Sequence, residues 1–318
     1  MNKFGFAFAA AVFAAGSGVA VAQNFPTRDI DLVVPFEPGG AVDATSRIIA
    51  EAANTLLDGS VGFTVSNRAG GGGVVGQTYA AQAEPDGYTV LAITSSVVTN
   101  PQLKGASYSV EDFVPVGLYN LDPEVIAVPA SSPFETVEAF LAAASQKPLN
   151  MVIAGIGTSH HMAGMAVERK SDATFNYVPT RGFGKQLQAV MGGHVDGAFW
   201  PMGEASSHAQ SGGVKILAVA SDERDPNFPD VPTFQEAGLD IPIWATFRGW
   251  SVPKGTPEEI VARLSGILGQ VSEMPDYKAK MSNAGYKPIF RDAKAFQSVV
   301  DDYAAQASAI IEENKLGK

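Results

Sequence analysis

The sequence contains no cysteine, so neither a disulfide framework nor a thiolate metal site holds its fold. Charged residues make up only 17% of the chain, the formal net charge is −11, and no stripe of Lys and Arg is present, which argues against nucleic-acid binding. Beyond the N-terminal segment, no stretch is long and apolar enough to span a membrane. The chain must therefore fold around its own cores, and its length allows two domains of roughly 150 residues each.

The N-terminal 22 residues have the features of a cleaved signal peptide. Lys3 supplies a positive charge, residues 4–15 form a short apolar run, and Ala20-Val21-Ala22 is a small-residue cleavage site. The apolar run is short for a membrane anchor, and no stop-transfer pattern follows it. We expect residues 1–22 to be removed after Ala22 and the protein to be exported, without a lipid anchor because no cysteine follows the cleavage point.

Strand-like and helical runs alternate along the rest of the chain, which is typical of α/β folds with parallel sheets. Strands are predicted at 30–34, 61–66, 88–93, 113–119, 125–128, 150–153, 174–178, 195–199 and 215–220. Helices are predicted at 42–57, 74–83, 136–144, 160–168, 184–191, 257–271 and 293–313. The extended run 241–250 indicates a return crossing between two lobes. We expect lobe 1 to comprise residues 23–119 plus 247–318 and lobe 2 to comprise residues 120–246.

Four loops rich in Gly, Ser and Thr follow predicted strands and open predicted helices, at residues 35–43, 67–76, 155–161 and 179–184. In open α/β sheets, ligands bind at the carboxyl ends of the strands. Free backbone N–H groups and the positive end of the helix dipole favour an anion at such a turn. If the two lobes face each other, these loops predict a binding cleft for a small carboxylate. Taken singly, each loop could equally be a plain strand–helix connection.

Other chemistry has little support in the residues. The run 71–76 matches G-x-G-x-x-G, but no acid follows the next strand to bind a ribose, and no Lys follows to make a P-loop. His160 and His161 lie about 100° apart on a helix and have no matching ligand cluster, so a metal is not expected. We expect one of them to pack in the helix and the other to face the cleft. No G-x-S-x-G elbow marks a nucleophile, so we expect no enzyme activity and no cofactor.

At these loops the chain resembles the substrate-binding proteins of tripartite tricarboxylate transporters, the Bug or TctC family. The motifs that carry the resemblance are Val33-Val34-Pro35-Phe36 with Pro38-Gly39-Gly40 and Asp43, Asn67-Arg68 with the glycine run to Gly76, Pro85-Asp86-Gly87-Tyr88-Thr89, Asp112-Phe113-Val114-Pro115-Val116, Gly192-Gly193-His194-Val195-Asp196, Pro229-Asp230-Val231-Pro232-Thr233 and Pro253-Lys254-Gly255-Thr256-Pro257. Each motif is modest alone, and their order along nearly the whole chain is specific.

The resemblance implies a two-lobed, type II periplasmic binding protein fold, with a mostly parallel sheet in each lobe and the ligand between them. It implies a periplasmic monomer that captures a di- or tricarboxylate by hinge closure and delivers it to the membrane permease subunits. The ligand-binding residues that it implies, or that stand beside the family motifs, are Phe36, Gly39, Gly40, Asp43, Gly72, Ser95, Thr158, Ser159, His160, Thr180, Arg181 and Gly182.

Three departures from the family pattern bear on the ligand. Thr180-Arg181-Gly182 replaces Tyr-Lys-Gly, and Arg181 either forks onto a carboxylate or points to solvent. Glu37 places an acid in the first anion loop, where it faces outward or selects a ligand that bears an amine. The usual Trp-x-Gly is Phe247-Arg248-Gly249. Asp43 has two interpretations: it caps the helix N-terminus, which we prefer, or it recognises an ammonium or hydroxyl group on the ligand.

Two further functions stay open at this point. The protein could report its carboxylate to a membrane sensor instead of a permease, which gene neighbourhood would distinguish. It could also be an exported hydrolase on the same two lobes, although the sequence offers no nucleophile for that chemistry.

Overall fold

The computed structural model describes residues 25–57, 59, 61–241 and 243–316. The predicted signal peptide and its cleavage after Ala22 lie outside the described residues. The strands are β1 Ile30–Val34, β2 Phe63–Asn67, β3 Thr89–Thr94, β4 Phe113–Pro129, β5 Leu149–Ile153, β6 Phe175–Pro179, β7 Gly197–Pro201, β8 Val214–Val219, β9 Ala245–Pro253 and β10 Arg291–Asp292. The α-helices are α2 Ala41–Leu56, α3 Val74–Ala81, α4 Ser96–Lys104, α5 Val137–Gln146, α6 Ser159–Arg169, α7 Phe183–Met191, α8 Met202–Gln210, α9 Glu258–Glu273, α10 Pro275–Asn283 and α11 Ala293–Glu313.

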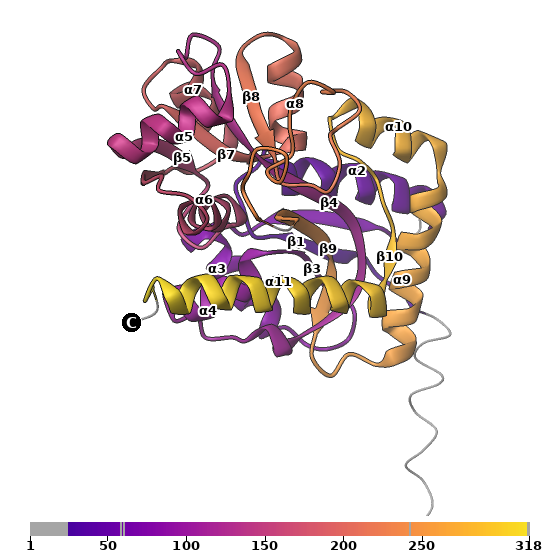
Figure 1. The fold of residues 1–318 in the computed structure, drawn as a ribbon. Helices are drawn as coiled ribbons and strands as arrows, with labels where there is room; N and C mark the ends of the chain where they lie inside the picture. The colour runs from indigo at the N-terminus through magenta and orange to yellow at the C-terminus, as the bar shows by residue number, and fades with distance from the viewer. Residues whose placement is uncertain (1–24, 58, 60, 242, 317–318) are drawn as a thin grey trace, which may run out of the picture.

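The strands form one curled, mixed sheet in the order β2-β1-β3-β9-β4-β7-β5-β6, with β8 and β10 also paired to β4. The predicted parallel units are present, because β1 pairs in parallel with β2 and β3, and β5 pairs in parallel with β6 and β7. However, β9 and β4 run antiparallel to their neighbours, so the sheet is less parallel than we expected. Helices flank both parallel groups, which gives the two-lobed α/β fold (Figure 1).

The long strand β4 joins the two parallel groups, and Figure 1 shows its curvature. Residues 113–123 of β4 pair with β9, whereas residues 124–127 pair with β7. The sequence predicted two separate strands here, at 113–119 and 125–128. That division was wrong because the polar residues Asn120, Asp122 and Glu124 interrupt the apolar pattern as a turn would, although they are buried within one continuous strand that changes its pairing partner there.

Three helices, α4, α8 and α10, were not predicted. Helix α4 begins at Ser96, just after the predicted strand 88–93, and it contains Pro101, a residue that normally interrupts a helix. The other two are short helices of nine residues with few apolar positions. Short helices of this kind are stabilised by tertiary contacts. Their own sequences therefore lack the apolar periodicity from which a helix is predicted.

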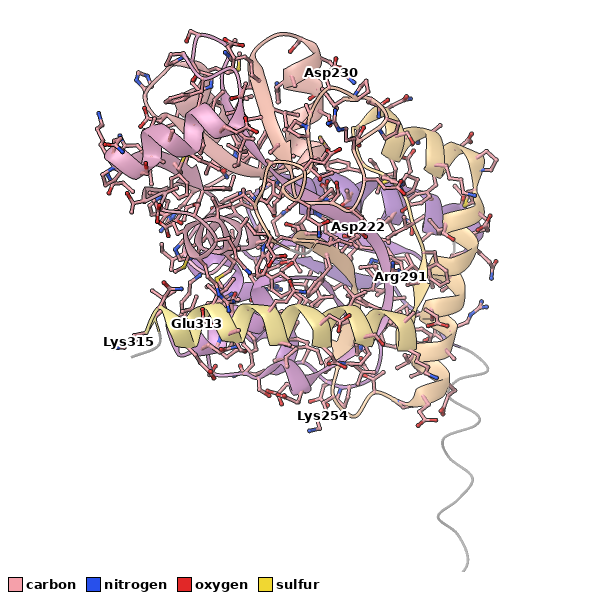
Figure 2. All side chains as sticks on the ribbon, in the orientation of Figure 1. Asp222, Asp230, Lys254, Arg291, Glu313 and Lys315 are labelled. Carbon is pink, nitrogen blue, oxygen red and sulfur yellow. The ribbon has the colours of Figure 1, made fainter. Side chains whose placement is uncertain are left out.

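The C-terminal helix α11 was predicted with its observed bounds, 293–313. It buries Phe296, Val300, Tyr303 and Ala307 at helical spacing against the sheet. Its end reaches α6, where Glu313 pairs with Arg169. Figure 2 shows Glu313 at that end of the helix, and the other labelled charges, Asp222, Asp230, Lys254, Arg291 and Lys315, are all exposed.

Gly249 in β9 marks a position where the fold has no room for a side chain. A Cβ atom there would lie 2.6 Å from the carbonyl oxygen of Gly117 and would collide with the ring of Phe296. We expect Gly249→Ala to lower the free energy of unfolding by about 1–3 kcal/mol, because neither backbone nor buried ring can move freely. The matched control is Gly266→Ala on exposed α9, where a Cβ meets nothing within 4 Å and helix propensity should stabilise. Urea denaturation measures the free energy of unfolding of both variants, and equal values would contradict this account of the packing.

Candidate functional site

The four predicted loops meet around one cavity. It encloses about 160 Å³ and is lined by residues from each of the segments 35–43, 67–76, 155–161 and 179–184. These segments follow β1, β2, β5 and β6, at the carboxyl ends of the two parallel groups. The expected convergence of the loops is therefore present in the fold, and we call this cavity the cleft.

The structure places eight of the twelve predicted residues in the lining of the cleft: Phe36, Gly40, Gly72, Thr158, Ser159, His160, Arg181 and Gly182. The other four, Gly39, Asp43, Ser95 and Thr180, lie beside the cleft and outside its lining. Glu37 also lines the cleft and is exposed, as is Arg181, so both stand at its rim.

Asp43 holds the first loop together. Its carboxylate accepts hydrogen bonds from the Gly39 amide at 2.9 Å and from Asn67 at 2.9 Å, and it forms an ion pair with Arg47. Although burial acts in the opposite direction, these hydrogen bonds lower the pKa of Asp43. This geometry favours the interpretation of Asp43 as a cap, and it consumes the Gly39 amide that was predicted to meet a ligand.

Ser95 and Thr180 also lie just behind the cleft surface. The Ser95 hydroxyl accepts a hydrogen bond from the backbone amide of Phe247 at 3.1 Å, which ties β9 to the start of α4. The Thr180 hydroxyl is buried and has no hydrogen-bond partner within the described part of the chain. Ser95 therefore positions a loop that contacts the cleft, whereas Thr180 is held through its backbone amide, which donates to the Ile153 carbonyl at 3.0 Å.

The glycine loop after β2 needs its glycines. Residues 70–73 all have positive φ values, between 60° and 148°, which glycine adopts far more readily than other residues. Lys104 donates to the Gly71 carbonyl at 2.7 Å, and Asn100 donates to the Gly72 carbonyl at 3.1 Å. Burial lowers the pKa of Lys104 to about 8. These two hydrogen bonds from α4 hold the glycine loop in place, where it lines the cleft.

The two adjacent histidines divide as expected. His160 lines the cleft, and its Nδ1 has no hydrogen-bond partner among the described residues. His161 points away, where its Nδ1 accepts from the Gly157 amide at 3.3 Å and its ring meets Tyr177 edge-on. Burial lowers the pKa of His160 to about 3, so this side chain presents a neutral imidazole to a ligand.

Sequence reasoning missed the polar floor of the cleft. Arg248 was noted only as a departure from a motif, and Glu204, Thr246, Gln186 and Ser96 were not considered, yet all five line the cleft. Arg248 was detectable as a single charge in the apolar run 241–250. Glu204 was detectable as an acid in the segment that follows the predicted strand 195–199, the kind of position at which the other loops were found.

Arg248 is the buried cation of this floor. The side chain is 1% exposed, donates to Asp122 at 2.8 Å and also donates to Asn120. Asp122 in turn accepts from the Gly203 amide at 2.9 Å, at the start of α8. The ion pair thus joins β9, β4 and α8 at the place where the two parallel groups of strands meet.

Two buried acids lie close to this pair. The Oε1 atom of Glu124 accepts from Thr246 at 2.7 Å, and Thr246 is also hydrogen-bonded to Ser159 at the start of α6. The Oε1 atom of Glu204 accepts weakly from the Ala41 amide at 3.4 Å. Burial raises the pKa of Glu124 to about 8 and that of Glu204 to about 7.

These groups give stability a specific pH dependence. The raised pKa values of Glu204 and Glu124 mean that the folded state binds more protons than the unfolded state up to about pH 8, so stability falls as the pH rises. Burial also lowers the pKa of His160 to about 3 and that of His161 to about 4, which opposes this trend below pH 6.5. We expect the free energy of unfolding to change little from pH 4.5 to 6.5 and to fall by about 2 kcal/mol from pH 6.5 to 8.

Urea denaturation at pH 5, 6.5 and 8 measures this dependence. The fall above pH 6.5 should be smaller in the Glu204→Gln variant, because one of the two titrating acids is then absent. A stability that rises from pH 6.5 to 8 would show that the buried acids do not control this range.

The chemistry of the cleft is that of a binding site. Backbone amides, hydroxyls and one neutral imidazole surround it, and a buried cation lies at its floor. No group of three or more Asp, Glu or His with an arrangement suited to a metal ion occurs among the described residues. Within the same residues, no helix has the length and apolar character to cross a membrane.

Comparison with known proteins is consistent with this geometry. Residues 45–316 match the TctC family, described as the tripartite tricarboxylate transporter family receptor. The UPF0065 protein in the tcbD-tcbE intergenic region of Pseudomonas sp. strain P51 is 35% identical over 273 residues, 83% of this chain and 79% of that protein. An R. palustris protein solved with adipate has 26% identity and a TM-score of 0.84, covering 91% of this chain and 97% of that one. MatC from Rhodopseudomonas palustris with bound malate has 27% identity and a TM-score of 0.83, and the match covers 90% of this chain and 100% of that one. The chain therefore belongs to the TctC family of tripartite tricarboxylate transporter receptors.

Proposed function

We propose that the protein captures a small carboxylate in the periplasm, by hinge closure of its two lobes, and delivers it to the membrane subunits of a tripartite tricarboxylate-type transporter. The observation that carries the proposal is the convergence of loops from both parallel groups on one enclosed cleft. Helices α2, α6 and α7 begin at these loops, so the positive ends of their dipoles face the cleft. Carboxylates are the anions that such an arrangement favours.

The relatives support the same class of ligand. TctC receptors are periplasmic solute-binding proteins and not enzymes, and two structures similar to this chain hold adipate and malate. Both molecules are dicarboxylates. A ligand with two anionic ends matches a cleft with helix starts on both sides, because each lobe can then hold one end.

The lobes of the proposal are residues 23–119 plus 247–318 and residues 120–246. Strands β4 and β9 connect the two lobes. They pair with each other through Asp122 and Thr246, at the boundary, while β9 also pairs with β3 of one group and β4 with β7 of the other. A hinge in these two strands would let the lobes close as rigid bodies while the sheet remains intact. We propose that the protein works as a monomer, since each chain carries a complete cleft.

Within the cleft, Phe36, Gly40 and Gly72 would contact the ligand from lobe 1, and the turn of Thr158, Ser159 and His160 would contact it from lobe 2. Arg181 and Gly182 would complete the rim, with the Arg181 guanidinium available to a carboxylate. Gly39, Asp43, Ser95 and Thr180 act indirectly in this proposal, because they hold the loops whose surfaces the ligand meets.

A thermal-shift screen tests the function. The protein is purified after export and mixed with mono-, di- and tricarboxylates, aromatic acids and amino acids. A true ligand at 100 times its Kd should raise the free energy of unfolding by about 2.7 kcal/mol. Stabilisation by amines that lack a carboxylate, with none by any carboxylate, would contradict the proposal.

A further inference from the structure

Two polar atoms at the floor of the cleft have no partner. The Nε of Arg248 and the Oε2 of Glu204 are buried and make no hydrogen bond to any described residue. Both side chains line the cleft, and they are 1% and 9% exposed. A buried polar atom without a hydrogen bond is costly, so each of these two atoms favours a partner from outside the described part of the chain.

The two side chains come from different elements and make no direct ion pair with each other within the described residues. Within the described residues, the ion pair of Arg248 is with Asp122, and no ion pair joins it to Glu204. Glu204 instead stands at the start of α2, where its Oε1 faces the Ala41 amide at 3.4 Å. The chain's own carboxylate therefore occupies part of the helix N-terminus that was expected to hold a ligand carboxylate.

This placement changes which ligand groups fit. A second carboxylate brought to the start of α2 would meet the free oxygen of Glu204 and would be repelled. An ammonium group there would donate to that oxygen and balance its charge. The Nε–H of Arg248, which can only donate, would at the same time donate a hydrogen bond to a ligand carboxylate.

We propose that Arg248 and Glu204 form a subsite for a ligand head group in which an ammonium neighbours a carboxylate, as in an α-amino acid. The inference rests on the proposed function and narrows it from small carboxylates to amino-bearing ones. The glycine loop 70–73 and the Thr158 turn remain for a second acidic group of the ligand.

Matched ligands that differ in one substituent test the subsite. Isothermal titration compares succinate, malate and aspartate, and then adipate, 2-hydroxyadipate and 2-aminoadipate, with the wild-type protein at pH 7.5. We expect the amino-bearing member of at least one series to bind at least about tenfold more tightly than its unsubstituted diacid, the effect of one charge-assisted contact. Tighter binding of the diacid, or of the hydroxy acid, than of the amino acid in both series overturns the inference.

The Glu204→Gln variant locates the preference. It keeps the size of the side chain and removes its charge, so the amino-bearing ligand should lose at least about tenfold in affinity, whereas the plain diacid should bind at least as tightly as it does to the wild type because the repulsion by Glu204 is gone. Glu135→Gln, which alters an exposed carboxylate of the same lobe, should change neither affinity. An unchanged preference in Glu204→Gln overturns the inference. Circular dichroism confirms that each variant is folded.

The pH profile of the wild type provides a measurement that needs no variant. The groups around Glu204 are Arg248, Asp122, Glu124 and Tyr286, and burial raises the pKa of Glu204 to about 7. An ammonium pairs with the ionised carboxylate, so its binding should be about eightfold weaker at pH 6 than at pH 7.5. In Glu204→Gln this dependence should vanish, whereas a contribution from Glu124 would persist. A flat or reversed wild-type profile overturns the inference.

The outcomes separate this inference from the function on which it rests. Carboxylate binding without any preference for an amine leaves the proposed function intact and overturns only the subsite. Failure of every carboxylate to bind, with or without an amine, overturns both.

Discussion

Replacing Arg248 by methionine is expected to lower the free energy of unfolding by about 3–5 kcal/mol, the typical cost of leaving a buried charge without its partner. Arg248 is the cation of an ion pair with Asp122, and Glu204 and Glu124 lie in the same buried region. Methionine fills a similar volume, so the loss reports charge and hydrogen bonding and not an empty cavity. Without the guanidinium, the remaining carboxyls must stay protonated in the folded state.

Equilibrium unfolding in urea measures the loss at pH 7, and a matched variant controls for it. Arg224 pairs with Glu236 on the surface, where both side chains are more than 40% exposed, so Arg224→Met should cost less than about 1 kcal/mol. The Arg248→Met protein should regain part of its stability at pH 5, because the unpaired acids can then take up protons. Equal losses in the two variants would mean that the buried pair contributes no more than an exposed one.

Replacing Gly40 by valine is expected to weaken carboxylate binding at least about 100-fold, or about 2.7 kcal/mol, with little change in stability. Gly40 precedes α2 with φ −85° and ψ 173°, an extended conformation that valine adopts without strain. The nearest atom to a Cβ at this position is the Glu37 carbonyl oxygen at 4.0 Å, so the new side chain enters open space. Since Gly40 lines the cleft, the added methyl groups would cover the start of α2 and exclude a ligand from it.

The control for this variant is Gly266→Val, which places the same side chain on exposed α9, away from the cleft, with no atom within 4 Å of its Cβ. Its affinity should equal that of the wild type. Titration with the best ligand from the thermal-shift screen gives both dissociation constants. If Gly40→Val binds within about threefold of the wild type, the loop after β1 is not part of the binding site.

Local patterns in the sequence were sufficient for most elements of the fold. The apolar run 30–34 and the helices α2 and α11 lie where the sequence pattern placed them. The strand is a continuous apolar run buried on both faces, and each helix buries one face at helical spacing. The long strand β4 and the short helix α4 were not predicted correctly. Their bounds depend on which segments they contact, and those contacts are distant in the sequence.

The candidate site divides in a similar way. Glycine-rich turns after apolar strands identified the loops that line the cleft, since the chemistry of such a turn is local. Arg248 and Glu204 are 44 residues apart in the chain and come from β9 and α8. No residue near either one in the sequence indicates that the other lies close to it in the fold. Sequence motifs therefore could not predict that both line the floor of the cleft.

By itself, the sequence predicted an export signal, and it determined the α/β class, the loops that end the parallel strands and the family to which the chain belongs. Only the tertiary structure decided which amides are already used, as the Gly39 amide is by Asp43, and which buried charges remain without a partner. The physical reason is that a turn or an amphipathic face is encoded within a few consecutive residues, whereas burial and electrostatic pairing depend on segments that become neighbours only when the sheet closes.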